Sequence, residues 1–190
     1  MKGKLILVIG PSGSGKSVLL AYLRTALPDI VFPVSYTTRL PRPGERDGVT
    51  YHFISEEEFQ THVAQGEFLE WANYGGNHYG TLQSQILPQL ARGKVIVREM
   101  EVQGAHQVQK ELPPEQLAII FINAGSWEES QRRIRTRAPI SDGELMARRR
   151  HYEDEMGFMQ KASRVIENPD GRIEKAKEEF LKAVRELSLQ

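Results

Sequence analysis

Residues 10–17 have the types and spacing of a phosphate-binding loop. They read Gly-Pro-Ser-Gly-Ser-Gly-Lys-Ser and match G-x-x-x-x-G-K-[ST] at every fixed position. Glycine lets backbone N–H groups turn inward, so such a loop forms an anion-binding concavity at a helix start. Lys16 would face the β- and γ-phosphates, and the Ser17 hydroxyl would bind Mg²⁺. We expect a nucleoside triphosphate to bind the whole loop: Gly10, Pro11, Ser12, Gly13, Ser14, Gly15, Lys16 and Ser17.

A second set of candidate residues could bind a phosphorylated base. Arg39 and Arg42 lie three apart in a proline-containing loop, and guanidinium groups pair well with a phosphate dianion. Glu70 lies near the end of the segment 66–71, between the apolar residues Leu69 and Trp71. A carboxylate can accept hydrogen bonds from N1–H and the 2-amino group of guanine, whereas adenine offers neither donor. The two clusters therefore favour a guanine nucleotide as phosphate acceptor.

These residues need a scaffold in which strands alternate with helices. Residues 5–9 form a continuous apolar run, typical of a strand buried on both faces of a parallel sheet, and 17–27 have helical spacing. Ser55, Ser126 and Ser141 each precede a helix as candidate N-caps, and Asn168-Pro169 predicts the start of the last helix. We predict an α/β fold with a mostly parallel sheet and further strands at 30–35, 51–54, 68–71, 95–100, 117–122 and 164–167.

Composition limits the functions that the chain can have. Its 190 residues carry 25 Lys and Arg against 25 Asp and Glu, and no Cys. Cysteine-based zinc sites, disulfide scaffolds and thiol nucleophiles are therefore excluded. The zero net charge argues against bulk nucleic-acid or membrane binding, and no apolar run approaches ~20 residues. We expect a cytoplasmic protein with no nucleic-acid or membrane partner.

The motifs together resemble guanylate kinases. The matching stretches are GPSGSGKS, VSYTTRLPRPGERDGVTYHF, GEFLEWANYGGNHYGT, EVQGA and RRIRTR, which extend from residue 5 to about residue 168. The resemblance implies a P-loop NTPase-like parallel sheet core flanked by helices, with a small strand-rich GMP-binding insertion and a helical lid. It also implies transfer of the γ-phosphate of ATP to GMP, giving ADP and GDP, with Mg²⁺ as cofactor.

The resemblance assigns roles residue by residue. Residues that would hold the GMP phosphate are Arg39, Arg42, Tyr51 and Tyr79. Residues that would recognise guanine are Ser35, Glu70 and Thr81. The lid arginines would be Arg133 and Arg137, with Arg148 on the following helix, and Asn168 would lie near the adenine. Lys16, Arg39, Arg133, Arg137 and Arg148 would form the catalytic set.

The chain departs from the family pattern at three places. The family usually has D-[IVL]-D-x-Q-G, whereas this chain has Glu99 and Glu101 in that string, preceded by Arg98. We expect Glu99 to face Mg²⁺ or its waters, and Glu101 to face guanine or the acceptor phosphate. Ala138-Pro139-Ile140 replaces the usual glycine-rich lid segment, and Asn168-Pro169 replaces the usual Asn-Asp.

The resemblance also predicts an internal division of the chain. Residues 1–34, 82–125 and 162–190 would form the core, 35–81 the GMP-binding insertion and 126–161 the lid region. Two other functions stay open from the sequence. One is a kinase of the same fold with a phosphorylated sugar as acceptor, and the other is a non-catalytic interaction module. ATP and GMP are the expected small-molecule partners, with the protein a monomer or weak homodimer.

Overall fold

The structure is a computed structural model that describes residues 3–137 and 140–189, without the side chain of Arg137. Its main sheet has four parallel strands in the order β6-β1-β7-β8. Their bounds are Val95–Glu99 (β6), Lys4–Ile9 (β1), Leu117–Asn123 (β7) and Arg164–Glu167 (β8). The predicted α/β class is therefore confirmed.

The central strand β1 is buried along its whole length. Alternate side chains point to opposite faces of a strand. Leu5, Leu7 and Ile9 pack into one apolar cluster, with residues of three helices that cover one face of the sheet. Ile6 and Val8 pack into the other cluster, with residues of the first and last helices. This two-sided burial explains why the strand appears in the sequence as an uninterrupted apolar run.

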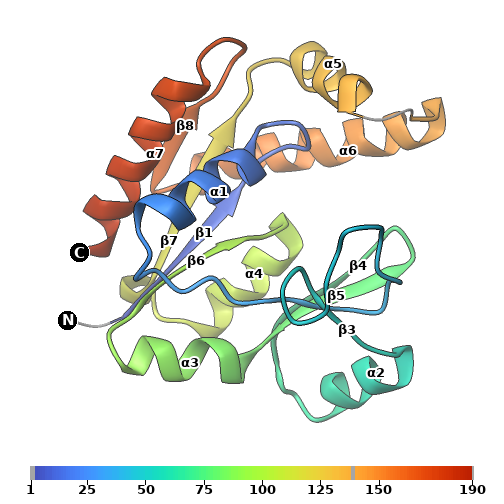
Figure 1. Ribbon diagram of the computed structural model, residues 1–190, viewed down its shortest axis with the longest axis vertical. Helices are drawn as coiled ribbons and strands as arrows, with labels where there is room; N and C mark the ends of the chain where they lie inside the picture. The colour runs from blue at the N-terminus through green and yellow to red at the C-terminus, as the bar shows by residue number, and fades with distance from the viewer. Residues whose placement is uncertain (1–2, 138–139, 190) are drawn as a thin grey trace.

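Helices cover both faces of the main sheet, and Figure 1 shows α5 and α2 on the side of the molecule away from the termini, α5 near the top and α2 near the bottom. The helices are α1 (Lys16–Ala26), α2 (Glu56–Ala64), α3 (Gln83–Ala91), α4 (Val102–Glu111), α5 (Trp127–Arg137), α6 (Asp142–Phe158) and α7 (Ile173–Ser188). Short 3₁₀ turns lie at Pro114–Gln116 and Met159–Lys161.

The middle of the chain builds a second, smaller sheet in the order β3-β2-β5-β4. Its core is separate from that of the main sheet and centres on Phe59, Phe68 and Leu82. Phe59 of α2 stacks on Phe68 with ring centroids 4.5 Å apart. The strands are β2 (Tyr36–Thr37), β3 (His52–Phe53), β4 (Phe68–Tyr74) and β5 (Asn77–Leu82).

Serine caps position three of these helices as predicted. At the start of α5, the Ser126 Oγ accepts from the Glu129 backbone N–H at 3.4 Å, and Glu129 Oε2 accepts from the Ser126 backbone N–H at 3.2 Å. The Ser55 Oγ accepts a hydrogen bond from the Glu58 backbone N–H at 3.1 Å. Ser141 and Glu144 form a full capping box at the start of α6. Such caps satisfy backbone N–H groups that have no partner within the helix.

Several local predictions were wrong or incomplete, and the strands β2 and β5 were not predicted. The expected strand at 30–35 reduces to a single bridge from Val31 to Ile96, because Pro33 lacks the N–H that a ladder needs. The last helix begins at Ile173, not at Pro169, because the Asn168 amide bonds elsewhere instead of capping it. Helix α4 was not predicted, since its apolar spacing is short and Gly104 lies in its first turn.

Candidate active site

The phosphate-binding loop connects β1 to α1. Gly10, Gly13 and Gly15 all have positive φ angles, which side chains rarely adopt, and Gly15 is the N-cap of α1. Lys16 Nζ donates to the carbonyl oxygen of Gly10 and to that of Pro11, the latter at 3.2 Å. The lysine charge is therefore held inside the loop, at the positive end of a helix.

Asn168 ties the end of β8 to this loop. Its side-chain Nδ2 donates to the Ser14 carbonyl oxygen at 2.7 Å, and the residue is only 3% exposed. A Cβ on Gly15 would lie 2.4 Å from that nitrogen. Glycine at 15 is therefore needed for the tie as well as for the backbone conformation. The structure places Asn168 against the loop, and its predicted contact with adenine stays a prediction.

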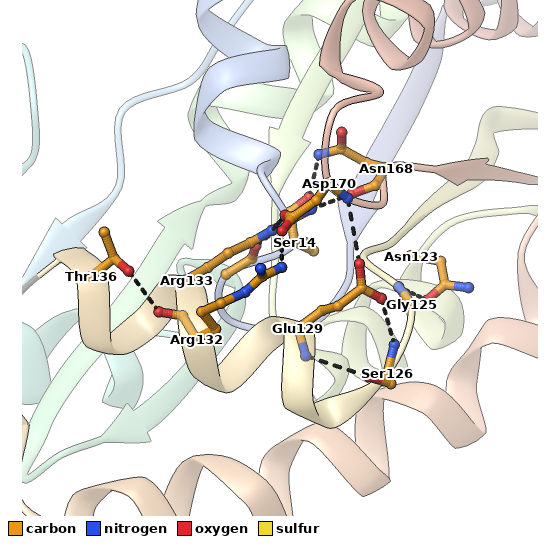
Figure 2. Close-up of polar contacts among 11 residues, drawn as sticks. Ser14, Asn123, Gly125, Ser126, Glu129, Arg132, Arg133, Thr136, Asn168 and Asp170 are labelled. Carbon is orange, nitrogen blue, oxygen red and sulfur yellow. Dashed lines mark hydrogen bonds and ion pairs between the residues drawn. The ribbon is translucent and has the colours of Figure 1, made fainter.

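Two arginines reach the same loop from the helices α5 and α6. Arg133 donates from Nη1 to the Gly13 carbonyl oxygen (3.2 Å), from Nη2 to that of Asn168 (2.8 Å) and from Nε to Asp170 Oδ1 (2.8 Å). Burial lowers the pKa of Arg133. Figure 2 shows Arg133, Asp170 and Asn168 gathered around Ser14. Arg148 Nη1 donates to Ser12 Oγ at 2.7 Å.

Arg137 ends α5, and its side chain lies outside the described residues, as do Ala138 and Pro139.

A cavity of about 440 Å³ lies between the two sheets. Side chains of both sheets line it, together with residues at the start of α4 and one residue of α6. Its wall includes most of the residues expected to bind GMP, together with two more from the catalytic and metal sets: Ser35, Arg39, Arg42, Tyr51, Glu70, Tyr79, Glu99, Glu101 and Arg148. Thr81 lies behind this wall, fully buried, and bonds to Glu70. The structure thus brings together residues that span more than 110 positions of the sequence.

One end of the cavity is cationic and aromatic. Arg39 makes a two-pronged ion pair with Glu45, with both N–O distances 2.8 Å. This hydrogen bonding raises the pKa of Arg39 and lowers that of Glu45 to about 2. The Arg39 guanidinium lies 5.3 Å from the centre of the Tyr51 ring, and Tyr51 packs edge-on against Tyr79. Burial raises the pKa of Tyr51 and keeps its hydroxyl protonated.

The other end centres on the Glu70 carboxylate, which is 5% exposed. Its Oε1 accepts from Thr81 Oγ1 at 2.5 Å and from Arg98 Nη2 at 3.2 Å. Arg98 projects from β6 and also lines the cavity. Arg98 was assigned no function from the sequence, although its position directly before Glu99 could have indicated that it lies near the site.

The carboxyl end of β6 brings acidic residues to the phosphate-binding loop. Glu99 Oε1 lies 3.6 Å from Lys16 Nζ. Glu101 is exposed and is the N-cap residue of α4. Glu155, which was also not predicted as a site residue, is buried on α6, and burial raises its pKa to about 8. Among the described residues, no group of three or more His, Cys, Asp or Glu could hold a metal ion.

Comparison with known proteins decides the family. The sequence matches the family described as "Guanylate kinase" over residues 2–187. The chain belongs to the guanylate kinase family. A guanylate kinase from Rubrobacter xylanophilus is 39% identical over 186 residues, which cover 98% of this chain and 95% of that protein. One from Synechococcus elongatus is 40% identical over 166 residues, covering 87% and 90%.

A solved structure extends the likeness to the fold. The crystal structure of guanylate kinase from Anaplasma phagocytophilum superposes with a TM-score of 0.76 at 27% sequence identity. The match covers 100% of this chain and 88% of that one. Within the part of the chain that the structure describes, no helix is long and apolar enough to cross a membrane.

Proposed function

We infer that the protein transfers the γ-phosphate of ATP to GMP, giving ADP and GDP. One observation carries the proposal above all. A single cavity has Arg39, which is paired with Glu45, at one end and the buried carboxylate of Glu70 at the other. The same cavity is lined by Glu99, which lies beside Lys16 of the phosphate-binding loop. Such a cavity can hold a nucleoside monophosphate with its phosphate directed toward ATP.

The acceptor would bind through charge at one end and hydrogen bonds at the other. We propose that the GMP phosphate contacts Arg39, Arg42, Tyr51 and Tyr79. The two hydrogen bonds to Glu45 fix the orientation of the Arg39 guanidinium, so the arginine is preorganised before GMP binds. We propose that guanine contacts Ser35, Glu70 and Glu101, while Thr81 fixes the Glu70 carboxylate.

Phosphoryl transfer needs alignment and charge stabilisation more than covalent help from the protein. Lys16 and the loop N–H groups would hold the β- and γ-phosphates. Arg148 and Arg133 both donate hydrogen bonds to the loop, Arg148 to the Ser12 hydroxyl and Arg133 to the Gly13 carbonyl oxygen. With Arg137, these cations would offset the negative charge that develops during transfer. Asn168 completes the proposed ATP site.

The donor set beside Lys16 fits Mg²⁺. Ser17 and Glu99 are exposed, and their side chains offer only oxygen atoms. Ser17 lies in the first turn of α1, and Glu99 is the last residue of β6, the strand beside β1. Two protein ligands are too few for a cage of protein atoms, which suits an ion carried mainly by phosphate oxygens and water. Bound there, Mg²⁺ would neutralise charge on the β- and γ-phosphates.

Water must be kept from the transferred group, since an open site would hydrolyse ATP. We propose that 126–161 act as the lid and 35–81 as the GMP-binding part, both moving against a core of 1–34, 82–125 and 162–190. We also propose a cytoplasmic monomer or weak homodimer whose partners are small molecules, without nucleic acid or membrane.

A coupled ADP-release assay tests the function directly. The purified protein, with ATP and Mg²⁺, would receive GMP, dGMP, AMP, CMP or UMP in turn. We expect GMP to accelerate ADP release far more than AMP, CMP or UMP. Equal rates with every acceptor, or acceleration by a phosphorylated sugar alone, would refute the proposal. No ATP turnover with any acceptor would favour the non-catalytic module.

The same assay locates the phosphate end of the cavity. Arg42→Met should raise the KM for GMP about tenfold or more while leaving the KM for ATP nearly unchanged, on the scale of one charged contact. Equal rises in both constants would argue against this placement of the GMP phosphate.

A further inference from the structure

Arg98 is an arginine in the wall of the base pocket that the proposed contacts leave without a role. Its side chain is 10% exposed and projects from β6, between α4 and the second sheet. A buried arginine is rare unless it is paired, because desolvating its charge is costly. Its partner is Glu70, at 3.2 Å from Nη2 to Oε1.

The pair fixes the orientation of the Glu70 carboxylate. Oε1 holds two donors, the Thr81 hydroxyl and Arg98 Nη2. Oε2 lies against α4, where a Cβ on Gly104 would approach it to 2.7 Å. With both oxygens confined, the carboxylate presents a fixed acceptor to whatever enters the cavity.

Arg98 has donors that Glu70 does not use. A guanidinium carries five N–H groups in one plane, and the contact with Glu70 takes only the Nη2 edge. Nε has no hydrogen-bond partner within residues 3–137 and 140–189, but it is fully buried. Nη1 also makes no hydrogen bond there and is not buried, so it is the donor left for a ligand in the cavity. The pocket wall therefore presents an acceptor beside a donor, with the donor not yet satisfied.

We propose that Arg98 is a specificity-determining residue that donates a hydrogen bond to the 6-position oxygen of the purine. The proposal rests on the function inferred above and deepens it. The Watson–Crick edge of guanine carries an acceptor at O6, then donors at N1 and the 2-amino group. Glu70 complements the two donors, and Arg98 complements the acceptor. The 6-amino group of adenine would instead meet Arg98 donor to donor.

The test compares GMP with 6-thioguanosine monophosphate, which keeps both donors and replaces O6 by sulfur, a weak acceptor. The parent should use GMP better, by about tenfold in kcat/KM, as expected for a bond to a charged donor. In Arg98→Met this preference should shrink to about twofold or less. Arg98→Lys keeps a cation beside Glu70, and its preference should fall to less than half of the parent's while staying above that of Arg98→Met.

Two comparisons separate specificity from a structural effect. Arg24 is another cavity-lining arginine, which lies 4.0 Å from the centre of the Phe32 ring. Arg24→Met should keep the parent's preference for GMP over the thio analogue. A purely structural role of Arg98 would lower kcat/KM for both nucleotides by the same factor.

The outcomes distinguish a failure of the proposed function from a failure of the proposed role of Arg98. If the parent fails to phosphorylate GMP, the proposed function itself is wrong. If the parent phosphorylates GMP but Arg98→Met keeps the parent's preference, Arg98 does not contact the 6-position. If Arg98→Met does not fold, Arg98→Lys decides, and a preference within twofold of the parent's overturns the proposal. An equal loss of preference in Arg24→Met would also overturn it.

Discussion

The phosphate-binding loop and the base pocket are built by different means. The loop uses eight consecutive residues, and its shape comes from positive φ angles at Gly10, Gly13 and Gly15. The base pocket uses side chains from β4, β5 and β6 that meet only after folding, as in the group of Glu70, Thr81 and Arg98. Backbone atoms form the first site, whereas side-chain hydrogen bonds form the second.

This difference explains what each site can recognise. Backbone N–H groups bind the phosphates that all nucleoside triphosphates share, so the loop is the same in many proteins of different specificity. The acceptor base is distinguished by a few buried hydrogen-bonding groups, whose positions depend on strand register. Substitutions in the loop should therefore stop turnover, and substitutions in the base pocket should change which acceptor is used.

The largest effect is expected in the loop. Lys16→Ala removes the charge beside the β- and γ-phosphates and should lower kcat by about 100-fold or more with GMP and with every other acceptor. Steady-state ADP release measures it. Lys182→Ala, which removes an exposed lysine from α7, is the matched control and should behave as the parent. A Lys16→Ala enzyme within tenfold of the parent would contradict this role for the loop.

Glu70→Gln should lower activity with GMP nearly as much as Lys16→Ala does. Unlike Lys16→Ala, it should also change the enzyme's preference among acceptor nucleotides. The amide turns one acceptor into a donor that faces a donor of guanine, so kcat/KM for GMP should fall about 100-fold. Inosine monophosphate, which lacks only the 2-amino group, is the sensitive probe. The ratio of GMP to inosine monophosphate efficiency should shrink in the variant. An unchanged ratio would make Glu101 the better candidate for reading the 2-amino group.

A smaller effect should follow from a methyl group in the wall behind the pocket. The Cβ of Gly104→Ala would lie 2.7 Å from Glu70 Oε2 and 3.0 Å from Met100 Cγ, so the pinned carboxylate must move. We expect the KM for GMP to rise about tenfold, as misplacement near 1 Å can cost even more. Gly143→Ala is the matched control, since nothing lies within 4 Å of a Cβ in that helical position. Equal KM values in the two variants would show that Gly104 does not position Glu70.

The last predicted effect is on the stability of the fold and its dependence on pH, and not on turnover. Burial raises the pKa of Glu155 in the folded protein from 4.5 to about 8, so the folded state binds more protons than the unfolded state between these values. Stability from this group is fully present below pH 4.5 and is lost as pH rises through about 8. In Glu155→Gln this loss disappears. The variant's Tm should therefore gain on the parent's between pH 5 and pH 9, and a constant difference would contradict the burial effect.

Sequence reasoning reached furthest where the signal was local. The loop, the two-sided strand β1 and the capped helix at Ser141 each follow from neighbouring residues, and the structure has them as predicted. Contacts between residues far apart in the sequence were not predicted. Nothing near Arg98 in the sequence indicates that Glu70, 28 positions earlier, is its partner. Asn168 likewise has the sequence of a helix cap, and its bond to Ser14 becomes visible only when β8 lies beside β7.

That bond also sets an order of events during synthesis of the chain. Residues 10–17 are made long before Asn168, because the hydrogen bond from Asn168 to the Ser14 carbonyl joins positions 154 apart. Closing so long a connection is entropically costly until the intervening sheet has formed. Arg133 and Arg148 contact the loop from positions 120 and 136 residues downstream. A growing chain therefore carries a complete phosphate-binding motif long before the contacts that hold the nucleotide site together can form, and we expect ATP to stabilise it only after Asn168 has been made.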